Sequence, residues 1–277
     1  MLIRVEHTTT YRYEQAPRAI TQILRMTPMQ TDGQHIRRWS VEPDFDARLH
    51  KGEDAFGNIT HTLYVDSPPE QLSLHVTGEV ETSDTAGTLG LIPEKLSPLV
   101  YLRDTPLTAS NAAISDLAAS LSQGSTLERL HRLMADISGR MTFRVGATTV
   151  HNTAAEVLSL GEGVCQDYAH LFIATARRMG IPARYVSGHL FREDGMNLQE
   201  ASHAWAEAYV ADIGWIGFDA ANGICPTDRY IRIGAGLDYL GAAPVRGSSI
   251  GGSNESMSVH IEVMDLRNPS RQQQQQQ

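Results

Sequence analysis

The chain has 277 residues, 41% of them hydrophobic, which is enough for one large or two modest cores and unlike a disordered composition. The formal net charge of −9 and the pI of about 5.6 argue against nucleic acid or an anionic membrane surface as the main partner, because both need a basic footprint. Two cysteines exclude a disulfide framework, and there is neither an apolar signal core nor a run approaching the ~20 residues of a membrane helix, so we expect a soluble cytoplasmic protein.

The first part of the chain predicts a β domain. Residues 2–13, 37–42, 60–65 and 72–80 are rich in β-branched and aromatic residues or alternate apolar with polar side chains, and turn formers separate them. Short strands at this spacing predict a small antiparallel β-sandwich over residues 1–82. Residues 83–106 break the pattern and are expected to form a linker.

A helical region follows and then a sheet. Apolar residues at helical spacing predict helices over 111–121 and 126–141, and a third over 165–179 is apolar nearly all round, as expected of a buried central helix. Strands are expected over 183–190, 202–210, 214–219 and 257–263, with a flexible loop over 248–254. The order predicts an α+β fold with a catalytic core over 107–266 and a disordered Gln-rich tail over 267–277.

The segment Gly161-Glu-Gly-Val-Cys-Gln-Asp-Tyr-Ala-His170 delivers a lone cysteine, Cys165, onto the first turn of the predicted central helix. A thiol at a helix N-terminus ionises more readily, and the thiolate is the reactive form. The free N–H groups of that turn can also hold an oxyanion, although only the Cys165 N–H can be named as a donor. Cys165 is therefore the candidate nucleophile.

The strand predicted over 202–210 supplies a candidate base. His203 and Trp205 share one face with Glu207 and Tyr209, and a row of alanines on the other face lets the central helix approach closely. A simple four-residue turn pairs Val210 with Trp215, which places Asn222 opposite His203 and turns Asp219 away. A bulge at Gly214 or Gly217 would bring Asp219 to His203 instead. At this point either Asp219 or Asn222 can orient the histidine.

Four segments resemble the bacterial transglutaminase-like superfamily, a papain-related group. They are Gly-Val-Cys-Gln-Asp-Tyr-Ala-His at 163–170, Gly-Ile-Pro-Ala-Arg-Tyr-Val-Ser-Gly at 180–188, Ser-His-Ala-Trp at 202–205 and Gly-Trp-Ile-Gly-Phe-Asp-Ala-Ala-Asn-Gly at 214–223. The resemblance covers roughly the second half of the chain, and residues 1–82 look like the β domain that precedes this core in bacterial members. It implies a papain-like core and a Cys–His–Asp triad at Cys165, His203 and Asp219. Ala220-Ala221 departs from the Pro-Thr that is frequent in the family.

Several other residues are weighed as cleft-lining or orienting groups, namely Gln166, Tyr168, Trp205 and Asn222. A core position is the alternative for Tyr168 and Trp205. The chain contains neither His-Glu-x-x-His nor Cys-x-x-Cys, and Gln166 occupies the third glycine position of a dinucleotide loop, so neither a metal nor a cofactor is expected.

We therefore expect a cysteine-dependent hydrolase of peptide, isopeptide or other amide bonds that works through a thioester acyl-enzyme. A transglutaminase that transfers the acyl group to an amine is the first alternative, and a non-catalytic binding module on the same fold is the second. The expected partner is a peptide or protein substrate or a small amide, with neither nucleic acid nor membrane. Three roles are open for the β domain: to shape the cleft, to occlude it, or to bind another protein or a second copy of the chain.

Overall fold

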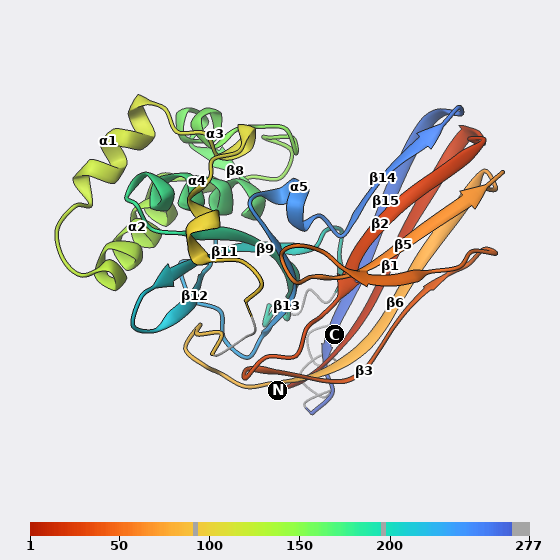
Figure 1. The fold of residues 1–277 in the computed structure, drawn as a ribbon, viewed down its shortest axis with the longest axis horizontal. Coiled ribbons are helices and arrows are strands. Elements are labelled where there is room, and N and C mark those ends of the chain that lie inside the picture. The colour runs from red at the N-terminus through yellow and green to blue at the C-terminus, as the bar shows by residue number, and fades with distance from the viewer. Residues whose placement is uncertain (91–93, 195–197, 268–277) are drawn as a thin grey trace.

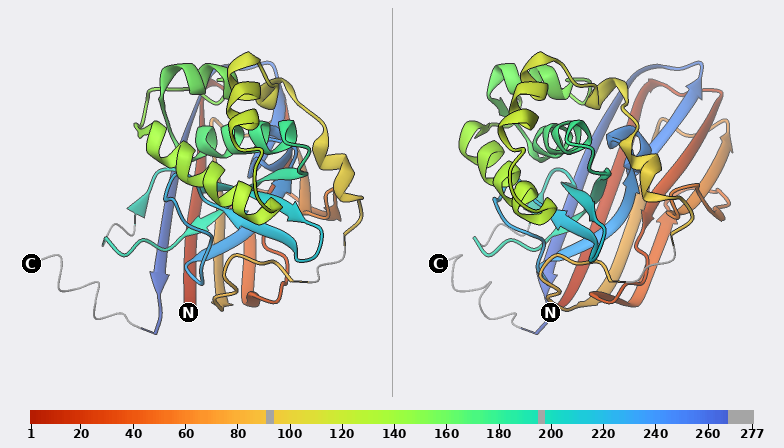
Figure 2. Two further views of the ribbon diagram at one scale, coloured as in Figure 1. Left: turned by 90° about the vertical axis from the view of Figure 1, so that its left-hand side faces the viewer. Right: turned by 60° about the vertical axis from the view of Figure 1, so that its left-hand side comes forward.

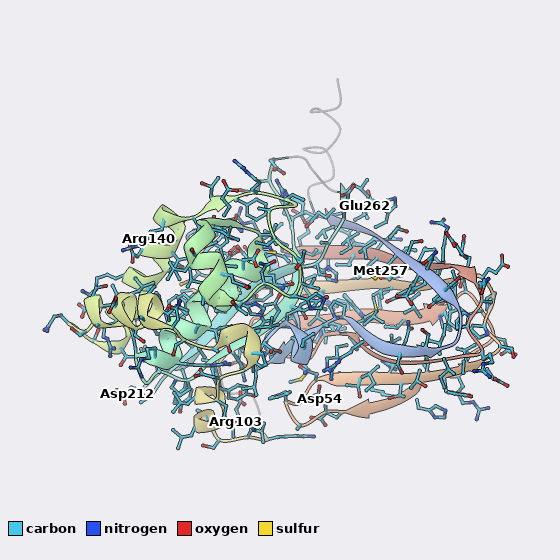
Figure 3. The ribbon with its side chains drawn as sticks, turned by 90° about the horizontal axis from the view of Figure 1, so that it is seen from above. Asp54, Arg103, Arg140, Asp212, Met257 and Glu262 are labelled. Carbon is cyan, nitrogen blue, oxygen red and sulfur yellow. The ribbon has the colours of Figure 1, made fainter. Side chains whose placement is uncertain are left out.

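The computed structural model of the protein describes residues 1–90, 94–194 and 198–267. Long antiparallel strands form one half of the molecule, and in the other half helices cover a smaller sheet (Figure 1). This is the α+β architecture that the sequence predicted. Seen from above, Arg140 and Asp212 lie in the helical half, Met257 lies on the long strands, and Asp54 lies near the junction (Figure 3). The tail expected over 267–277 falls outside the described residues from position 268 onward.

The β half contains two antiparallel sheets, with strand orders β10-β15-β1-β6-β3 and β14-β2-β5-β4. Buried and more exposed residues alternate along β1, so that one face packs on the core, as is typical of a sandwich. The strands are β1 (Leu2–Gln15), β2 (Ala19–Thr27), β3 (Gln34–Pro43), β4 (His50–Glu53), β5 (Ile59–Asp66), β6 (Gln71–Thr82), β10 (Leu198–Gln199), β14 (Val245–Ile250) and β15 (Ser253–Asp265).

Two of these strands come from the far end of the chain, which corrects the expected division. β15 pairs with β1 along its length, from Ile3 opposite Asp265 to Gln15 opposite Ser253, and β14 pairs with β2. The sandwich therefore consists of residues 1–82 together with 245–265 and the short strand β10, and the core expected over 107–266 does not extend to residue 266. The loop expected over 248–254 is the end of β14, a turn at Gly251-Gly252 and the start of β15. Serine and glycine on an exposed edge strand resemble a loop when the sequence is read without its partner strand.

The helical half packs its helices on one face of the four-stranded sheet β12-β11-β9-β13 (Figure 2). The helix over 126–140 begins at Thr126, as expected, and Ser125 and Glu128 form a capping box at its start. The elements are η1 (Pro98–Leu102), η2 (Pro106–Thr108), α1 (Ala112–Ser120), α2 (Thr126–Arg140), β7 (Thr142–Phe143), α3 (Ala154–Leu160), β8 (Glu162–Gly163), α4 (Cys165–Arg178), β9 (Ala183–Leu190), β11 (His203–Val210), β12 (Gly214–Phe218), β13 (Tyr230–Gly236) and α5 (Tyr239–Ala242).

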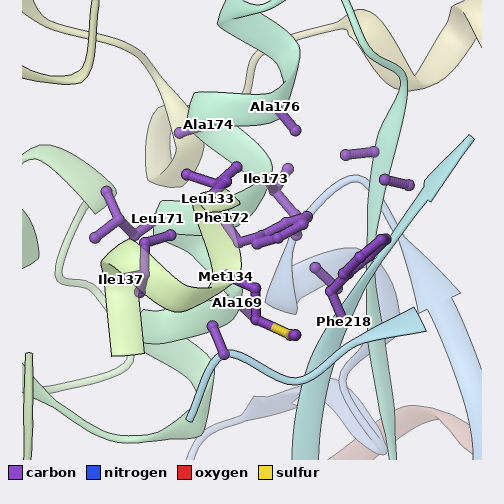
Figure 4. Packing of buried hydrophobic residues seen from close by; sticks show 14 of the residues in the cluster. Leu133, Met134, Ile137, Ala169, Leu171, Phe172, Ile173, Ala174, Ala176 and Phe218 are labelled. Atoms are coloured by element: carbon purple, nitrogen blue, oxygen red, sulfur yellow. The ribbon is translucent and has the colours of Figure 1, made fainter. Parts of the chain in front are cut away.

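The central helix α4 is buried on nearly all sides, as its composition predicted. The alanines of β11 belong to the same core cluster as α4, and their small side chains let the helix lie close to the sheet. Phe172 of α4 stacks on Phe218 of β12, with ring centroids 5.1 Å apart (Figure 4). The dense packing of α4 against the sheet fixes the position of its first residue, Cys165.

The helix α4 is also held at its C-terminus. Gly180 takes a left-handed conformation with φ +76°, and the Ile181 N–H bonds to the Ala176 carbonyl, as in a Schellman motif. The buried Arg177 guanidinium donates to the carbonyls of Tyr101, Ala183 and Leu237, which ties the helix to the linker and to the end of β13. Among the described residues, no helix is long and apolar enough to cross a membrane.

Candidate active site

Asp167 caps the start of α4, and two amide groups of the first turn have no acceptor within the helix. Asp167, on the first turn, accepts hydrogen bonds from the Val164 N–H at 2.8 Å and from the Thr148 hydroxyl at 2.6 Å. A Cβ at Gly163 would lie 2.6 Å from the Asp167 carboxylate, so this close cap needs glycine there. The N–H groups of Cys165 and Gln166 have no acceptor within the helix, because they belong to its first turn.

The hairpin of β11 and β12 resolves the register question. Val210 pairs with Gly214 and Ala206 with Phe218, one residue away from the pairing of a four-residue turn. A hydrogen bond from the Ile213 N–H to the Val210 carbonyl closes the turn, and Gly214 follows with φ +98°, the arrangement of a G1 bulge. Of the two bulge positions considered, Gly214 is the one that shifts the register, and the strands pair without interruption at Gly217. In this register Asp219 follows β12 on the face that carries His203.

His203 lies between a thiol and a carboxylate. Its Nε2 is 2.6 Å from Asp219 Oδ2, and Cys165 is near enough to raise the pKa of the imidazole. Because Nε2 bonds to Asp219, Nδ1 is the ring nitrogen left for the thiol. His203 and Asp219 are buried, with side-chain exposures of 11% and 1%, whereas Cys165 is half-buried. The structure thus brings the three residues of the expected triad together.

Asp219 is held by a dense set of donors. Oδ2 accepts from His203 and also from Asn222 Nδ2 at 2.7 Å and the Tyr230 hydroxyl at 2.8 Å. Oδ1 accepts from the backbone N–H groups of Ala221 at 3.1 Å and Asn222 at 3.2 Å, as in an Asx turn. The departure at Ala220-Ala221 leaves this contact intact, since a backbone N–H at position 221 supplies it. Asn222 therefore contacts the carboxylate, and its Nδ2 is also 3.5 Å from His203 Nε2.

Charge at the site favours an imidazolium beside a carboxylate. Burial opposes the charge on His203, but Asp219 and Cys165 outweigh it and raise the pKa of His203 to about 10. Burial also opposes the charge on Asp219, yet His203 and the hydrogen bonds from Asn222 and Tyr230 hold the pKa of Asp219 below its usual value. Burial and then Asp219 raise the pKa of Tyr230, which keeps its hydroxyl protonated as a donor. At neutral pH His203 is therefore positively charged.

The other candidates from the sequence lie around the triad rather than on it. Gln166 is buried and donates to the Val150 carbonyl at 3.3 Å. Tyr168 is part of the main core cluster, with its ring 6.4 Å from that of Phe143. Trp205 is buried behind the histidine, with ring centroids 6.1 Å apart. Sequence reasoning missed Tyr230, because no local pattern marks a residue that reaches Asp219 from the far edge strand of the sheet.

A cleft of about 440 Å³ adjoins His203 and Asn222. Apolar side chains contribute to its lining, namely Phe143, Leu190, Phe191 and Ile224. Its charged side chains pair with one another, Arg229 with Glu193 and Arg192 with Asp194. Among the residues that the structure describes, no group of three His, Cys, Asp or Glu side chains could hold a metal ion.

Comparison with known proteins matches both halves of the chain. Residues 115–220 match the family model of the transglutaminase-like superfamily, and residues 3–81 match that of the bacterial transglutaminase-like N-terminal region. An uncharacterized protein of Mycobacterium leprae is 29% identical over 95% of this chain and 99% of its own length. One of Mycobacterium tuberculosis is 30% identical over 94% of this chain and 92% of its own length.

A solved structure shares the fold. It is that of a candidate cysteine protease from Cytophaga hutchinsonii, which is 23% identical with a TM-score of 0.78 and covers 96% of this chain and 91% of its own. The chain therefore belongs to the transglutaminase-like superfamily and carries the N-terminal region of its bacterial members.

Proposed function

We propose that the protein is a cysteine-dependent hydrolase of peptide, isopeptide or related amide bonds. The observation that carries the proposal is that Cys165, at the start of α4, lies beside His203, which is hydrogen-bonded to Asp219. A nucleophile beside a base that a third group orients is the arrangement that activates a thiol.

The reaction follows from the positions of these groups. The Cys165 thiolate attacks the amide carbonyl, and in this proposal the N–H groups of the first turn of α4, at Cys165 and Gln166, stabilise the oxyanion. Protonated His203 gives its proton to the leaving nitrogen as the C–N bond breaks, which releases an amine and leaves a thioester. Neutral His203 then takes a proton from water, whose oxygen attacks the thioester and releases a carboxylic acid and the thiolate.

The cleft beside His203 suggests the kind of group that a substrate carries near the scissile bond. Phe143 contributes an aromatic side chain that is 54% exposed, and Phe191 and Ile224 add apolar surface. Among the described residues that line the cleft, the arginine, aspartate and glutamate side chains are paired with one another, which favours a substrate group without charge. We infer that a peptide with a large apolar side chain beside the scissile amide fits this cleft best.

The test compares the wild type with Cys165→Ala and Cys225→Ala on peptide and isopeptide substrates that the wild type cleaves. Loss of turnover in Cys165→Ala alone, and a block by iodoacetamide that persists in Cys225→Ala, support the proposal. Full activity in Cys165→Ala would rule it out. Adding a labelled primary amine separates hydrolysis from acyl transfer, because only a transglutaminase incorporates the label into the acyl donor.

A further inference from the structure

The β half supplies side chains that complete the edge of the catalytic sheet. β13 is an outer strand of that sheet, yet its backbone at Arg232 and Ala235 is paired. Gln34 of β3 donates to the Arg232 carbonyl at 2.9 Å and accepts from the Arg232 N–H at 2.8 Å. Asn58 makes the same pair of bonds with Ala235, each at 2.7 Å. Each carboxamide thus replaces the peptide group of a missing neighbouring strand.

Both carboxamides are themselves held in place. Gln34 and Asn58 are buried, with exposures of 4% and 1%, so unpaired polar groups here would be costly. Asn58 also donates to Asp54 at 3.0 Å, and Asp54 in turn accepts from Arg25 at 2.8 Å. Gln34 donates a further hydrogen bond to the Met29 carbonyl at 2.8 Å. The edge of β13 is therefore fixed to the β half at two separate points.

The strand fixed in this way begins with Tyr230, two residues before Arg232. The Tyr230 hydroxyl donates to Asp219 Oδ2 at 2.8 Å. Its ring lies 5.8 Å from the ring of His203 and packs edge-on against Trp205 at 5.4 Å. A continuous set of contacts thus leads from Gln34 through β13 to the carboxylate of the triad.

We propose that Tyr230 is a positioning residue for the triad and that the β half holds it in place through Gln34. The inference rests on the proposed function of the Cys165, His203 and Asp219 site. It gives the β half a role in the chemistry, which is to set the hydroxyl that fixes the orientation of Asp219.

The physical consequence concerns proton affinity as well as geometry. Asp219 Oδ2 shares its charge among three donors, from His203, Asn222 and Tyr230. Besides these groups, the charged and titratable side chains that act on them are Cys165 from α4 and Arg229 just before β13. Removing the hydroxyl leaves Oδ2 a stronger acceptor for His203, so the imidazolium becomes harder to deprotonate and a weaker acid toward the leaving amine.

The experiment measures the rate at which iodoacetamide alkylates Cys165 as a function of pH, and mass spectrometry locates the modified residue. The rate is expected to change in a step at the pH where His203 loses its proton. The step at which His203 loses its proton should move up by roughly 0.5 to 1 pH unit in Tyr230→Phe, the equivalent of one hydrogen bond. Tyr101→Phe, which removes a buried hydroxyl away from the triad, should leave the step unchanged. An unchanged step in Tyr230→Phe, or an equal shift in Tyr101→Phe, would overturn the positioning role.

The part played by the β half needs its own pair of variants. Gln34→Ala should move the step in the alkylation profile to higher pH, as Tyr230→Phe does. Asn58→Ala removes an equal pair of hydrogen bonds to β13, but farther from Tyr230, and should leave the pH of the step unchanged. Gln34→Met, which fills the same space, replaces Gln34→Ala if the latter does not fold. Equal shifts at positions 34 and 58, or none at position 34, would overturn this assignment.

Alkylation requires no turnover, so this inference and the proposed function can fail separately. An unshifted step in an enzyme that hydrolyses amides rejects only the positioning role. A shifted step in a protein that hydrolyses none of the tested amides upholds the positioning role and rejects the proposed function.

Discussion

Replacing Asp219 with asparagine tests the triad most directly, because the carboxylate receives five hydrogen bonds that an amide cannot all accept. Two backbone N–H groups point at Oδ1, and His203, Asn222 and Tyr230 point at Oδ2. The side chain of asparagine has only one oxygen. If that oxygen stays with the backbone N–H groups, the NH2 group faces His203 Nε2 and favours the tautomer whose proton lies on Nδ1, beside the thiol.

The size of the effect follows from the charge that is lost. The pKa of His203 is about 10 against an ordinary value of 6.5, and Asp219 is the main favourable influence against the cost of burial. Without the carboxylate, that pKa should fall back toward its ordinary value, so that His203 should lose its positive charge near neutral pH. We expect kcat to fall by roughly 10³- to 10⁴-fold, as for the loss of the orienting carboxylate in other triads.

The assay is the pH dependence of kcat between pH 5 and 11 on an amide that the wild type cleaves, with folding checked by circular dichroism. The wild type should lose activity as pH rises through about 10, where His203 loses its proton, and Asp219→Asn should lose it at lower pH. Asn222→Ala keeps the carboxylate and serves as the matched control, with a loss of roughly tenfold or less. An Asp219→Asn variant of near-normal activity and unchanged alkaline limb, or a larger loss in Asn222→Ala, would refute Asp219 as the orienting group.

Three further outcomes are expected. Glu207 is fully buried between Arg184 and Arg232, at 2.6 and 2.7 Å, so Glu207→Gln should lower the free energy of urea unfolding at pH 7 by about 3–5 kcal/mol, and a loss below about 1 kcal/mol would contradict this. Burial lowers the pKa of His189 to about 3, so its contribution to stability is complete above pH 6.5 and is lost as the pH falls toward 3. Between pH 7 and 5 the free energy of unfolding should fall by about 2 kcal/mol because of His189, and His189→Asn should abolish this part of the fall. The same pH dependence of unfolding in the variant and the wild type would argue against a contribution from His189. Phe143→Ala should raise KM for apolar peptides by roughly tenfold with little change in kcat or melting temperature, and an unchanged KM would remove Phe143 from the substrate site.

Much of the transglutaminase-like half could be predicted from local sequence. Each of these predictions rests on a pattern that spans only a few residues. The glycines around Cys165 indicated the start of α4, its apolar run indicated a buried helix, and the alternation along 202–210 indicated the two faces of β11. The hairpin left a one-residue ambiguity, because the choice of turn decides the register and both candidate orienting groups lie just beyond the strand. Tertiary structure resolves it at Gly214, whose positive φ takes up the extra residue.

Local sequence patterns could not predict contacts between distant parts of the chain. The strands over 245–265 close the β-sandwich only by pairing with β1 and β2, more than 200 residues away. Gln34 contacts β13 across the junction, and the Tyr230 hydroxyl reaches Asp219 from the far edge strand of the smaller sheet. Residue type and spacing therefore determined which candidate nucleophile and base the chain carries, because a thiol at a helix start and an imidazole on a strand are local features. Only the tertiary structure decided how the carboxylate is held, since its hydrogen-bond donors come from separate segments that long-range pairing brings together.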